Sequence, residues 1–213
     1  MAKTANTSTS KRRRKKVVPN KVRWNSDVIV DLMRQYDFPY VPLNPGASFR
    51  GLHDSMVNYG QDDPPMILCP HENIAIQMAH GYAKIEGKPM MVMAHGTVGL
   101  QHASMAIYNA YADRVPMLVL TGNIGKPETR QAYIEWDHSA QDQAATVRDI
   151  TKWDDQPASL QGFAESMVRG YDMMTTAPMA PVLIVADGDL QALADRLASV
   201  AYRPRELIFS RGD

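Results

Sequence analysis

The sequence changes character within the stretch Pro89-Met90-Met91-Val92-Met93-Ala94-His95-Gly96-Thr97-Val98-Gly99-Leu100. Residues 89–94 form a short apolar run without polar alternation, which is typical of a strand that is buried on both faces. Residues 95–100 break this run with two glycines, and an apolar helical pattern follows as far as Ala110. The stretch therefore predicts a strand, a loop and a helix in direct succession, which is the repeating unit of parallel α/β sheets.

The same succession recurs along most of the chain. Further strands are predicted at residues 40–43, 66–69, 117–121, 150–153 and 182–186, and further helices at residues 26–36, 48–60, 71–86, 158–174 and 190–200. Ser26 and Ser48 stand where side-chain caps of the first two helices are expected, and Gly87 stands at the end of the third. The alternation predicts an α/β fold, with a parallel sheet of about six strands and helices on both faces.

The formal net charge of zero hides an uneven distribution of charge. Residues 1–23 hold nine lysines and arginines and no acid, so the rest of the chain carries a net charge of −9. This acidic body argues against nucleic acid as a main ligand, because phosphate contacts need concentrated positive charge. No apolar run reaches the length of about 18 residues that a membrane-spanning helix needs. A single cysteine, Cys69, excludes a disulfide framework and fits a cytoplasmic location.

The basic segment at the start of the chain is predicted to be a disordered tail over residues 1–22, because it has almost nothing to bury. Its run Lys11–Lys16 is compatible with a solvated tail, a nuclear address, a nucleic-acid arm or a contact with a membrane surface. A secretory signal is excluded, since only two valines separate this run from Pro19. A transit peptide is compatible with the composition, although the segment lacks the apolar face of an amphipathic helix.

Three segments that follow predicted strands carry unusual chemistry. They are Asn44–Ser48, Pro70–Glu72 and His95–Gly99. Ligands of open α/β sheets bind beyond the carboxyl ends of the strands, so we expect these segments to share one cleft. Each segment also has a purely structural interpretation. Pro45-Gly46 is a common turn pair, Glu72 suits the positive end of a helix, and a histidine such as His95 at the end of a strand is usually a hydrogen-bonded structural residue.

Several familiar motifs are absent from the sequence. His71-Glu72 would open a zinc-protease helix only with a histidine at position 75, where Ala75 stands. The six histidines show no metal-ligand spacing with nearby acids or the thiol, so no metal site is predicted in this chain. Gly96 and Gly99 do not match a dinucleotide-binding fingerprint, because a third glycine at the right spacing is missing.

Taken in order, the motifs of this chain resemble the amino-terminal pyrimidine-binding domain of thiamine-diphosphate enzymes such as acetolactate synthase, pyruvate oxidase and benzoylformate decarboxylase. The series consists of Asn44–Gly46, Pro70–Glu72, Ala79–Lys84, Gly87–Pro89, His95–Gly99, Asn109–Pro116 and Leu120–Asn123, with Val147–Trp153 and Ala180–Ile184 as the last elements. The resemblance covers about residues 26–190. Its specificity lies in the order of the motifs, since no single motif would suffice.

The resemblance implies a catalytic role for two residues. Glu72 is expected to hydrogen bond a ring nitrogen of the cofactor's aminopyrimidine and so to activate the cofactor, a role that suits a partly desolvated carboxylate. His95 replaces a Thr-Ser-Gly-Pro-Gly-like loop of acetolactate synthases, whereas benzoylformate decarboxylase is similar in placing a histidine there. By that analogy His95 transfers protons in the reaction, with packing of the cofactor loop as the alternative. The cofactor-binding residues implied by the family are Asn44, Pro45, Gly46, Glu72, Gly96, Thr97, Gly99 and His102.

The diphosphate site of the family has no counterpart in this sequence. Relatives bind the diphosphate and Mg²⁺ through a second domain that carries Gly-Asp-Gly followed by paired asparagines. The only near match here is Asp187-Gly188-Asp189, with Ala186 in place of the first glycine and no asparagine after it. The resemblance thus implies half of a thiamine diphosphate site. Residues 23–200 would form the pyrimidine-binding domain, residues 201–213 a linker, and a partner domain or subunit would hold Mg²⁺.

The implied function is that of the pyrimidine-binding half of a thiamine-diphosphate-dependent decarboxylase or carboligase. Its substrate would be a small 2-oxo acid, and the enzyme would be a homo- or hetero-oligomer. A non-catalytic dimerisation or regulatory homologue of the same domain is the alternative, and the presence of Glu72 favours catalysis.

Overall fold

The central sheet buries both of its faces, which explains why its strands are continuous apolar runs. Met91 and Met93 belong to one cluster of buried side chains, whereas Val92 and Ala94 belong to the other, because successive residues of a strand point to opposite faces. The computed structural model describes residues 24–123 and 140–191 of the chain. The predicted tail, the predicted linker and most of the predicted helix at residues 190–200 lie outside this part.

The sheet contains six strands in the order β2-β1-β3-β4-β6-β5, and each neighbouring pair is parallel. The strands are β1 (Val41–Leu43), β2 (Met66–Leu68), β3 (Met91–Ala94), β4 (Leu118–Asn123), β5 (Trp153–Asp155) and β6 (Val182–Asp187). The predicted α/β class and parallel sheet are therefore confirmed. The strand predicted at residues 150–153 begins only at Trp153, because Arg148–Ile150 form a short 3₁₀ turn instead.

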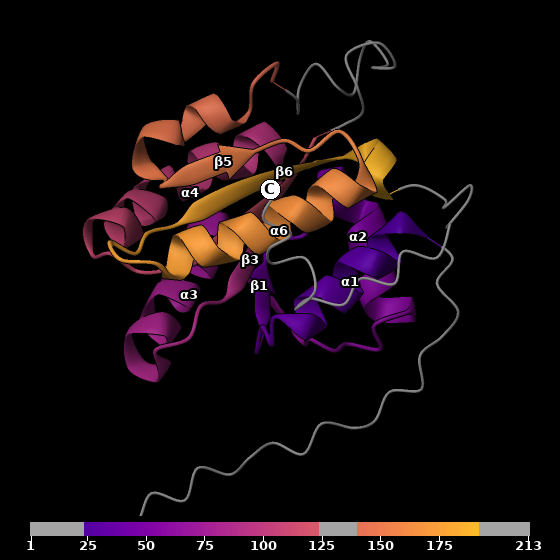
Figure 1. Cartoon of the computed structure of the whole chain (residues 1–213), viewed down its shortest axis with the longest axis horizontal. Coiled ribbons are helices and arrows are strands. Elements are labelled where there is room, and N and C mark those ends of the chain that lie inside the picture. The colour runs from indigo at the N-terminus through magenta and orange to yellow at the C-terminus, as the bar shows by residue number, and fades with distance from the viewer. Residues whose placement is uncertain (1–23, 124–139, 192–213) are drawn as a thin grey trace, which may run out of the picture.

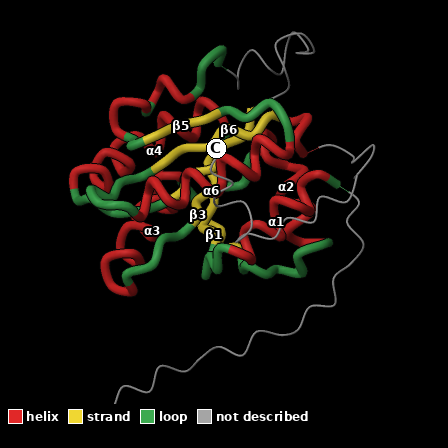
Figure 2. Tube along the Cα trace, in the orientation of Figure 1, coloured by secondary structure: helices red, strands yellow, loops and turns green. Residues whose placement is uncertain are grey.

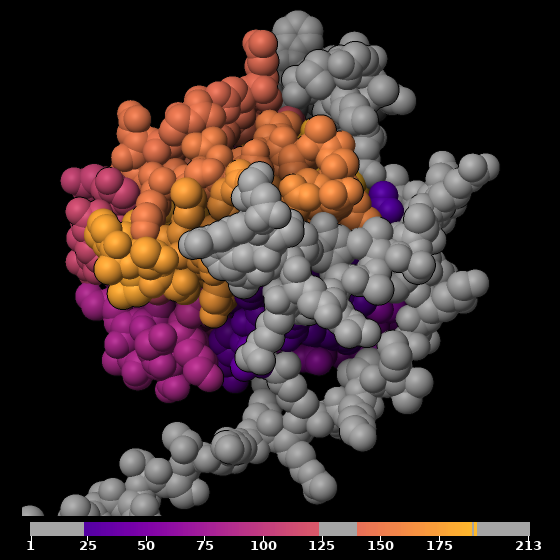
Figure 3. Space-filling view, in the orientation of Figure 1, coloured from indigo at the N-terminus to yellow at the C-terminus, as the bar shows by residue number. Residues whose placement is uncertain are grey.

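Helices cover both faces of the sheet (Figures 1 and 2). The first face carries α1 (Asn25–Gln35), α2 (Arg50–Asn58) and α6 (Leu160–Thr175), and the second carries α3 (Glu72–Glu86) and α4 (Gly96–Ala112). Four 3₁₀ turns complete the described chain: η1 (Ala47–Phe49), η2 (Ala144–Thr146), η3 (Arg148–Ile150) and η4 (Gly188–Gln191). The orange segment, which includes α6, covers much of the face seen in Figure 3. Among the described residues, no helix has the length and apolarity to cross a membrane.

Two predicted helix caps are wrong, for the same physical reason. Ser26 is buried, and its hydroxyl pairs with that of Ser55 at 2.7 Å, so it joins α1 to α2 and does not cap α1. Ser48 lies inside η1 and its hydroxyl is used elsewhere, as described below. In both cases a tertiary partner replaces the local backbone N–H. Gly87 does end α3, as predicted, and its N–H donates to the carbonyl of Ala83 at 2.9 Å.

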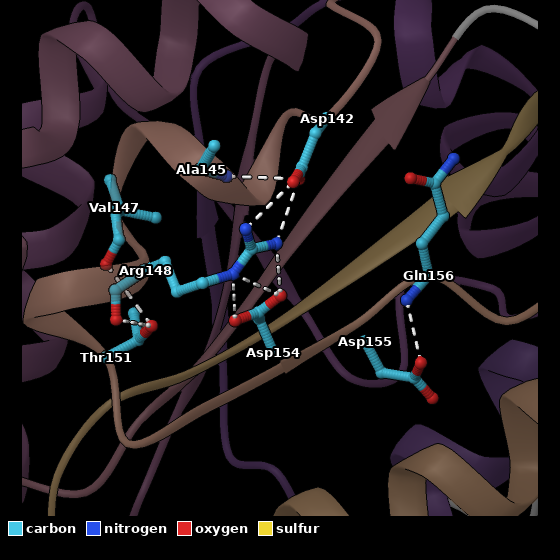
Figure 4. A network of polar contacts seen from close by, with 8 residues as sticks. All are labelled: Asp142, Ala145, Val147, Arg148, Thr151, Asp154, Asp155 and Gln156. Carbon is cyan, nitrogen blue, oxygen red and sulfur yellow. Dashed lines mark hydrogen bonds and ion pairs between the residues drawn. The ribbon is translucent and has the colours of Figure 1, made fainter.

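Arg148 fastens the segment that returns to β5 (Figure 4). Its guanidinium donates to both carboxylate oxygens of Asp142, at 2.8 and 2.9 Å, and to both of Asp154, at 3.0 Å each. The hydrogen bonds from Arg148 hold the pKa of the Asp142 carboxyl below its usual value. Because two forked contacts share one guanidinium, this arrangement fixes η2 and η3 against the edge strand.

We expect Arg148→Met to lower the thermal midpoint at pH 7 and to have a progressively smaller effect as the pH falls below about 3.9. The Asp142 pKa is lowered in the folded state, so the stabilisation is present above the unfolded pKa of about 3.9 and is lost as the pH falls through the lower folded value. Thermal unfolding of both proteins from pH 3 to pH 7 measures this difference. An effect of Arg148→Met that stays equal across this range would contradict the assignment.

Strand β4 passes so close to η1 that only glycine fits at position 122. A Cβ on Gly122 would lie 1.8 Å from the carbonyl oxygen of Ser48 and 2.3 Å from its carbonyl carbon. Both neighbours are backbone atoms, so neither can move aside without displacing the turn that carries Ser48.

Gly122→Ala is therefore expected to lower the free energy of unfolding by about 1–3 kcal/mol, the usual range for overpacking. Gly81→Ala on α3 is the matched control, because a Cβ there meets nothing within 4 Å. That change should instead stabilise the protein by up to about 1 kcal/mol, since alanine is the better helix former. Urea unfolding of the two variants gives both values, and equal midpoints would refute the close approach.

Candidate functional site

The candidate site lies at the carboxyl edge of the sheet, where β1 and β3 are neighbours. The chain leaves β1 toward β2 on one side and leaves β3 toward β4 on the other, so the connections diverge at this point of the sheet. In open α/β sheets such a switch point leaves a crevice in which ligands bind. Two of the three predicted loops, Asn44–Ser48 and His95–Gly99, follow β1 and β3 and meet here.

His95 is held between the loop after β1 and the start of α4. Ser48, which is only 4% exposed, places its hydroxyl oxygen 2.9 Å from Nδ1 of His95 and accepts a hydrogen bond from the backbone N–H of Gly96 at 3.0 Å. A Cβ on Gly46 would lie 2.6 Å from the Cγ atom of the His95 ring. The imidazole therefore packs directly on the backbone of the Asn-Pro-Gly loop, and Ser48 joins it to the first turn of α4.

Glu72 is the first residue of α3 and is only 2% exposed. The helix begins there because the preceding residue, His71, caps it: its Nδ1 accepts the backbone N–H of Asn73 at 3.1 Å. Oε2 of Glu72 lies 3.3 Å from Nδ1 of His102, in the second turn of α4. Among the described residues, none hydrogen bonds the other carboxylate oxygen, Oε1. A buried carboxylate thus keeps one oxygen for a ligand.

Gly99 allows α4 to approach Glu72 closely. A Cβ at this position would lie 2.9 Å from Oε1 of Glu72 and 3.1 Å from Cβ of His95. The absence of a side chain therefore lets the first turns of α4 pack directly against the carboxylate and the histidine. An aminopyrimidine ring fits this arrangement chemically, because a carboxylate accepts hydrogen bonds from ring N–H groups and a side chain on residue 99 would crowd that oxygen.

The structure brings together most, but not all, of the residues predicted for the site. Contacts run from Gly46 to His95, from His95 to Gly99, from Gly99 to Glu72 and from Glu72 to His102. Gly96 joins them through Ser48. Among the described residues, no side-chain hydrogen bond links Asn44 or Thr97 to this group, Pro45 adjoins it only as the neighbour of Gly46 in the chain, and the Thr97 hydroxyl is buried without a hydrogen-bond partner. The predicted loop at residues 95–100 is wrong, since α4 begins directly at Gly96.

The sequence does not predict the roles of three residues of the site. Ser48 resembles an ordinary helix cap, and Gly122 has no sequence signal for its close approach to Ser48. His71 stacks on His102 with ring centroids 4.7 Å apart and an interplanar angle of 23°, although the two are 31 positions apart. His71, Glu72 and His102 each offer a ligand atom within 4.8 Å of the others. Spacing along the chain hides this group because its third member comes from the next helix.

Comparison with known proteins assigns the chain to a family. The sequence model for the family described as thiamine pyrophosphate enzyme, N-terminal TPP binding domain, matches residues 23–146. This match covers more than half of the chain, so the chain belongs to the thiamine pyrophosphate enzymes and represents their N-terminal domain. The resemblance inferred from the order of the motifs is therefore confirmed.

Relatives of this chain include decarboxylases and acetolactate synthases. A protein named "probable 2-ketoarginine decarboxylase" from Pseudomonas aeruginosa is 30% identical over 200 residues, which is 87% of this chain and 33% of the relative. The acetolactate synthase large subunit of Lactococcus lactis is 27% identical over 84% of this chain and 30% of its own length. The chain thus spans about a third of the length of these relatives.

Solved structures share the fold at lower sequence identity. The thiamine diphosphate-dependent 4-hydroxybenzoylformate decarboxylase of Rhodococcus jostii superposes with a TM-score of 0.71 at 23% identity, over 79% of this chain and 31% of that protein. Benzoylformate decarboxylase from Polynucleobacter necessarius gives a TM-score of 0.69 at 20% identity, over 85% of this chain and 33% of that protein. Both likenesses support the architecture of the sheet and its helices.

We expect Ser48→Ala to lower the free energy of unfolding by about 1–3 kcal/mol, because the N–H of Gly96 opens α4, has no intrahelical acceptor and is buried. Ser104→Ala is the matched control on the same helix. Its hydroxyl only donates to the carbonyl of Leu100, so its loss should cost about 0.5 kcal/mol or less. Urea unfolding gives both values.

The same substitution should also change the ¹⁵N shifts of the His95 ring, because Nδ1 loses its neighbour. A Ser48→Ala protein with an unchanged His95 ring spectrum and full stability would contradict the contacts assigned to the Ser48 hydroxyl, those with Gly96 and His95.

Proposed function

We propose that this chain is the pyrimidine-binding half of a thiamine-diphosphate-dependent 2-oxo-acid decarboxylase or carboligase. The observation that carries the proposal is the buried carboxylate of Glu72, whose Oε1 packs against Gly99 and accepts no hydrogen bond from the described residues. When bound, the cofactor would supply the nucleophile and the electron sink for chemistry on a 2-oxo acid. The chain's own residues would bind and orient the aminopyrimidine end of that cofactor.

Glu72 has the surroundings that this role requires. Because the residue is almost inaccessible to water, a hydrogen bond from a ring nitrogen to Oε1 is not weakened by competition with solvent. His102 holds the other oxygen, which fixes the plane of the carboxylate. The rigid first turn of α3 keeps the group in place. Glu72 would thus accept and stabilise a proton shared with the ring.

His95 is proposed to move protons between the protein and the substrate. Its Nδ1 lies 2.9 Å from the Ser48 hydroxyl, which orients the imidazole ring. Contacts with Gly46 and Gly99 keep the ring within the crevice, on the same side as Glu72. A histidine suits this task because its pKa lies near neutral pH in the absence of strong perturbation.

The surface around Glu72 suits burial by a partner domain or subunit. Leu68, Ile74, Met105 and Tyr108 expose 68, 44, 62 and 49% of their area, and they lie at the end of β2 and on α3 and α4. Large apolar side chains exposed on the elements that carry a site are typical of an interface. We propose that the diphosphate-binding domain or subunit, which would hold Mg²⁺, or a second copy of this domain covers them.

The proposal predicts weak binding of thiamine diphosphate to this chain alone, with a dissociation constant no better than roughly millimolar. Only the aminopyrimidine contacts can form without the partner, and they must offset the entropy of association unaided. NMR titration should move the amide signals of Gly99 and His102. Micromolar, Mg²⁺-dependent binding would show that the chain contains a diphosphate site, and the half-site proposal would fall.

Glu72→Gln should weaken this binding by roughly 10-fold or more, since a hydrogen bond to a charged group is worth about 1.5–3 kcal/mol. Glu86→Gln, at the exposed end of the same helix, is the matched control and should leave the affinity unchanged. If Glu72→Gln binds as tightly as the unmodified chain, Glu72 does not hold the ring.

A further inference from the structure

We propose that His71, Glu72 and His102 form a binding site for a zinc-type divalent ion, and that this ion competes with the cofactor's aminopyrimidine for Glu72. The competition rests on the proposed function, whereas the metal site rests on the donor atoms alone. All three ligand atoms lie within 4.8 Å of one another. Two imidazoles and one carboxylate make up a donor set that zinc commonly uses, with a fourth position left for water.

The distance between two of the donors already suits a metal. Nδ1 of His102 and Oε2 of Glu72 are 3.3 Å apart. Ligands bound to zinc at about 2.0–2.2 Å with tetrahedral angles are separated by roughly 3.4 Å. An ion can therefore replace the proton between these two atoms with little movement of either residue. The proton can move to Nε2 of His102, whose side chain is 57% exposed.

His71 is the weakest of the three donors. Its ring stacks on that of His102, so it is close enough to join, but its Nδ1 accepts the N–H of Asn73 at the start of α3. Ligation through Nδ1 displaces this cap. Ligation through Nε2 requires the proton to sit on Nδ1, where it would face the N–H of Asn73. Either way the cap is lost, which predicts that His102 contributes more affinity than His71.

The charge of Glu72 is available to a cation. No lysine or arginine of the described part of the chain forms an ion pair with Glu72, which has His102 as its partner. The comparable group on α3 and at the end of α4 is different, because Lys84 lies 2.7 Å from the Asp113 carboxylate that His80 also contacts. An ammonium group already neutralises that carboxylate, so we expect no metal there. Mg²⁺ should also avoid the proposed site, since it prefers oxygen ligands in octahedral geometry.

Cys69 is a poor alternative ligand. The thiol is 3% exposed, and burial raises its pKa, so the thiolate that zinc needs is disfavoured. It also donates to the carbonyl of Ile67 at 3.6 Å. The imidazoles of His71 and His102 are therefore the donors through which an ion would reach Glu72.

Calorimetric titration of the full, tag-free chain with zinc chloride tests the site. We expect one ion per chain with a micromolar dissociation constant and no heat of binding from magnesium chloride. His102→Ala should weaken the affinity at least ~10-fold, because even the loss of a side chain that only orients a metal ligand costs that much. Glu72→Gln should have an effect at least as large, and His71→Ala a smaller one. His102 is exposed, so its substitution should not disturb folding, which circular dichroism verifies.

His53→Ala is the matched control, because this histidine of α2 is not part of the group, and Cys69→Ser excludes the thiol. Both variants should bind zinc as the unmodified chain does. A His102→Ala protein with unchanged zinc affinity would overturn the site, as would the absence of zinc binding below millimolar concentrations.

Thiamine tests the competition, since it carries the aminopyrimidine but no phosphate that would chelate zinc. In the zinc-saturated chain, thiamine should no longer shift the amide signal of Gly99. If it shifts that signal equally with and without zinc, the competition is refuted. If zinc binds with the expected variant pattern but thiamine shifts nothing even without zinc, the proposed function fails and the metal site stands.

Discussion

Helices cover both faces of the parallel sheet, so its strands can satisfy their backbone groups only through neighbouring strands and must carry apolar side chains on both sides. Polar chemistry is thereby excluded from the body of the sheet and is confined to its edges. At the carboxyl edge, the connections after β1 and β3 diverge, which is where ligands bind in open α/β sheets. Glu72, His95 and His102 all come from segments that begin at this edge.

Close packing on three glycines fixes the positions of the site residues. Gly46 touches the His95 ring, Gly99 lies beside Glu72, and Gly122 lies against the carbonyl of Ser48. Each of these approaches would be blocked by a single added methyl group. Ser48 then links the crowded loop to α4 through two hydrogen bonds of its hydroxyl. The position of His95 thus depends on packing that involves β1, β3 and β4 together.

Glu72 links the two proposals made for this protein. A buried carboxylate is costly unless its charge is stabilised, and among the described residues Glu72 has one imidazole at 3.3 Å besides its place at the positive end of α3. Because Oε1 of Glu72 can still accept a hydrogen bond, the carboxylate would suit a ring nitrogen of the cofactor. With His71 and His102 beside it, the same carboxylate would also suit a zinc-type ion. Occupancy of the site by a cation and by the cofactor would then be linked through one side chain.

The sequence by itself determined the succession of strands and helices, the parallel class of the sheet and the family, because apolar runs, helical periodicity and motif order are local properties of the chain. It also pointed to Glu72 and His95 through that motif order. Only the tertiary structure decided that Ser26 and Ser48 bond to distant partners and do not cap their helices, and that α4 starts directly after His95. It alone placed His71 against His102. These features depend on contacts between residues that lie roughly 30 to 50 positions apart, and no local pattern encodes which distant backbone or side chain a polar group will meet.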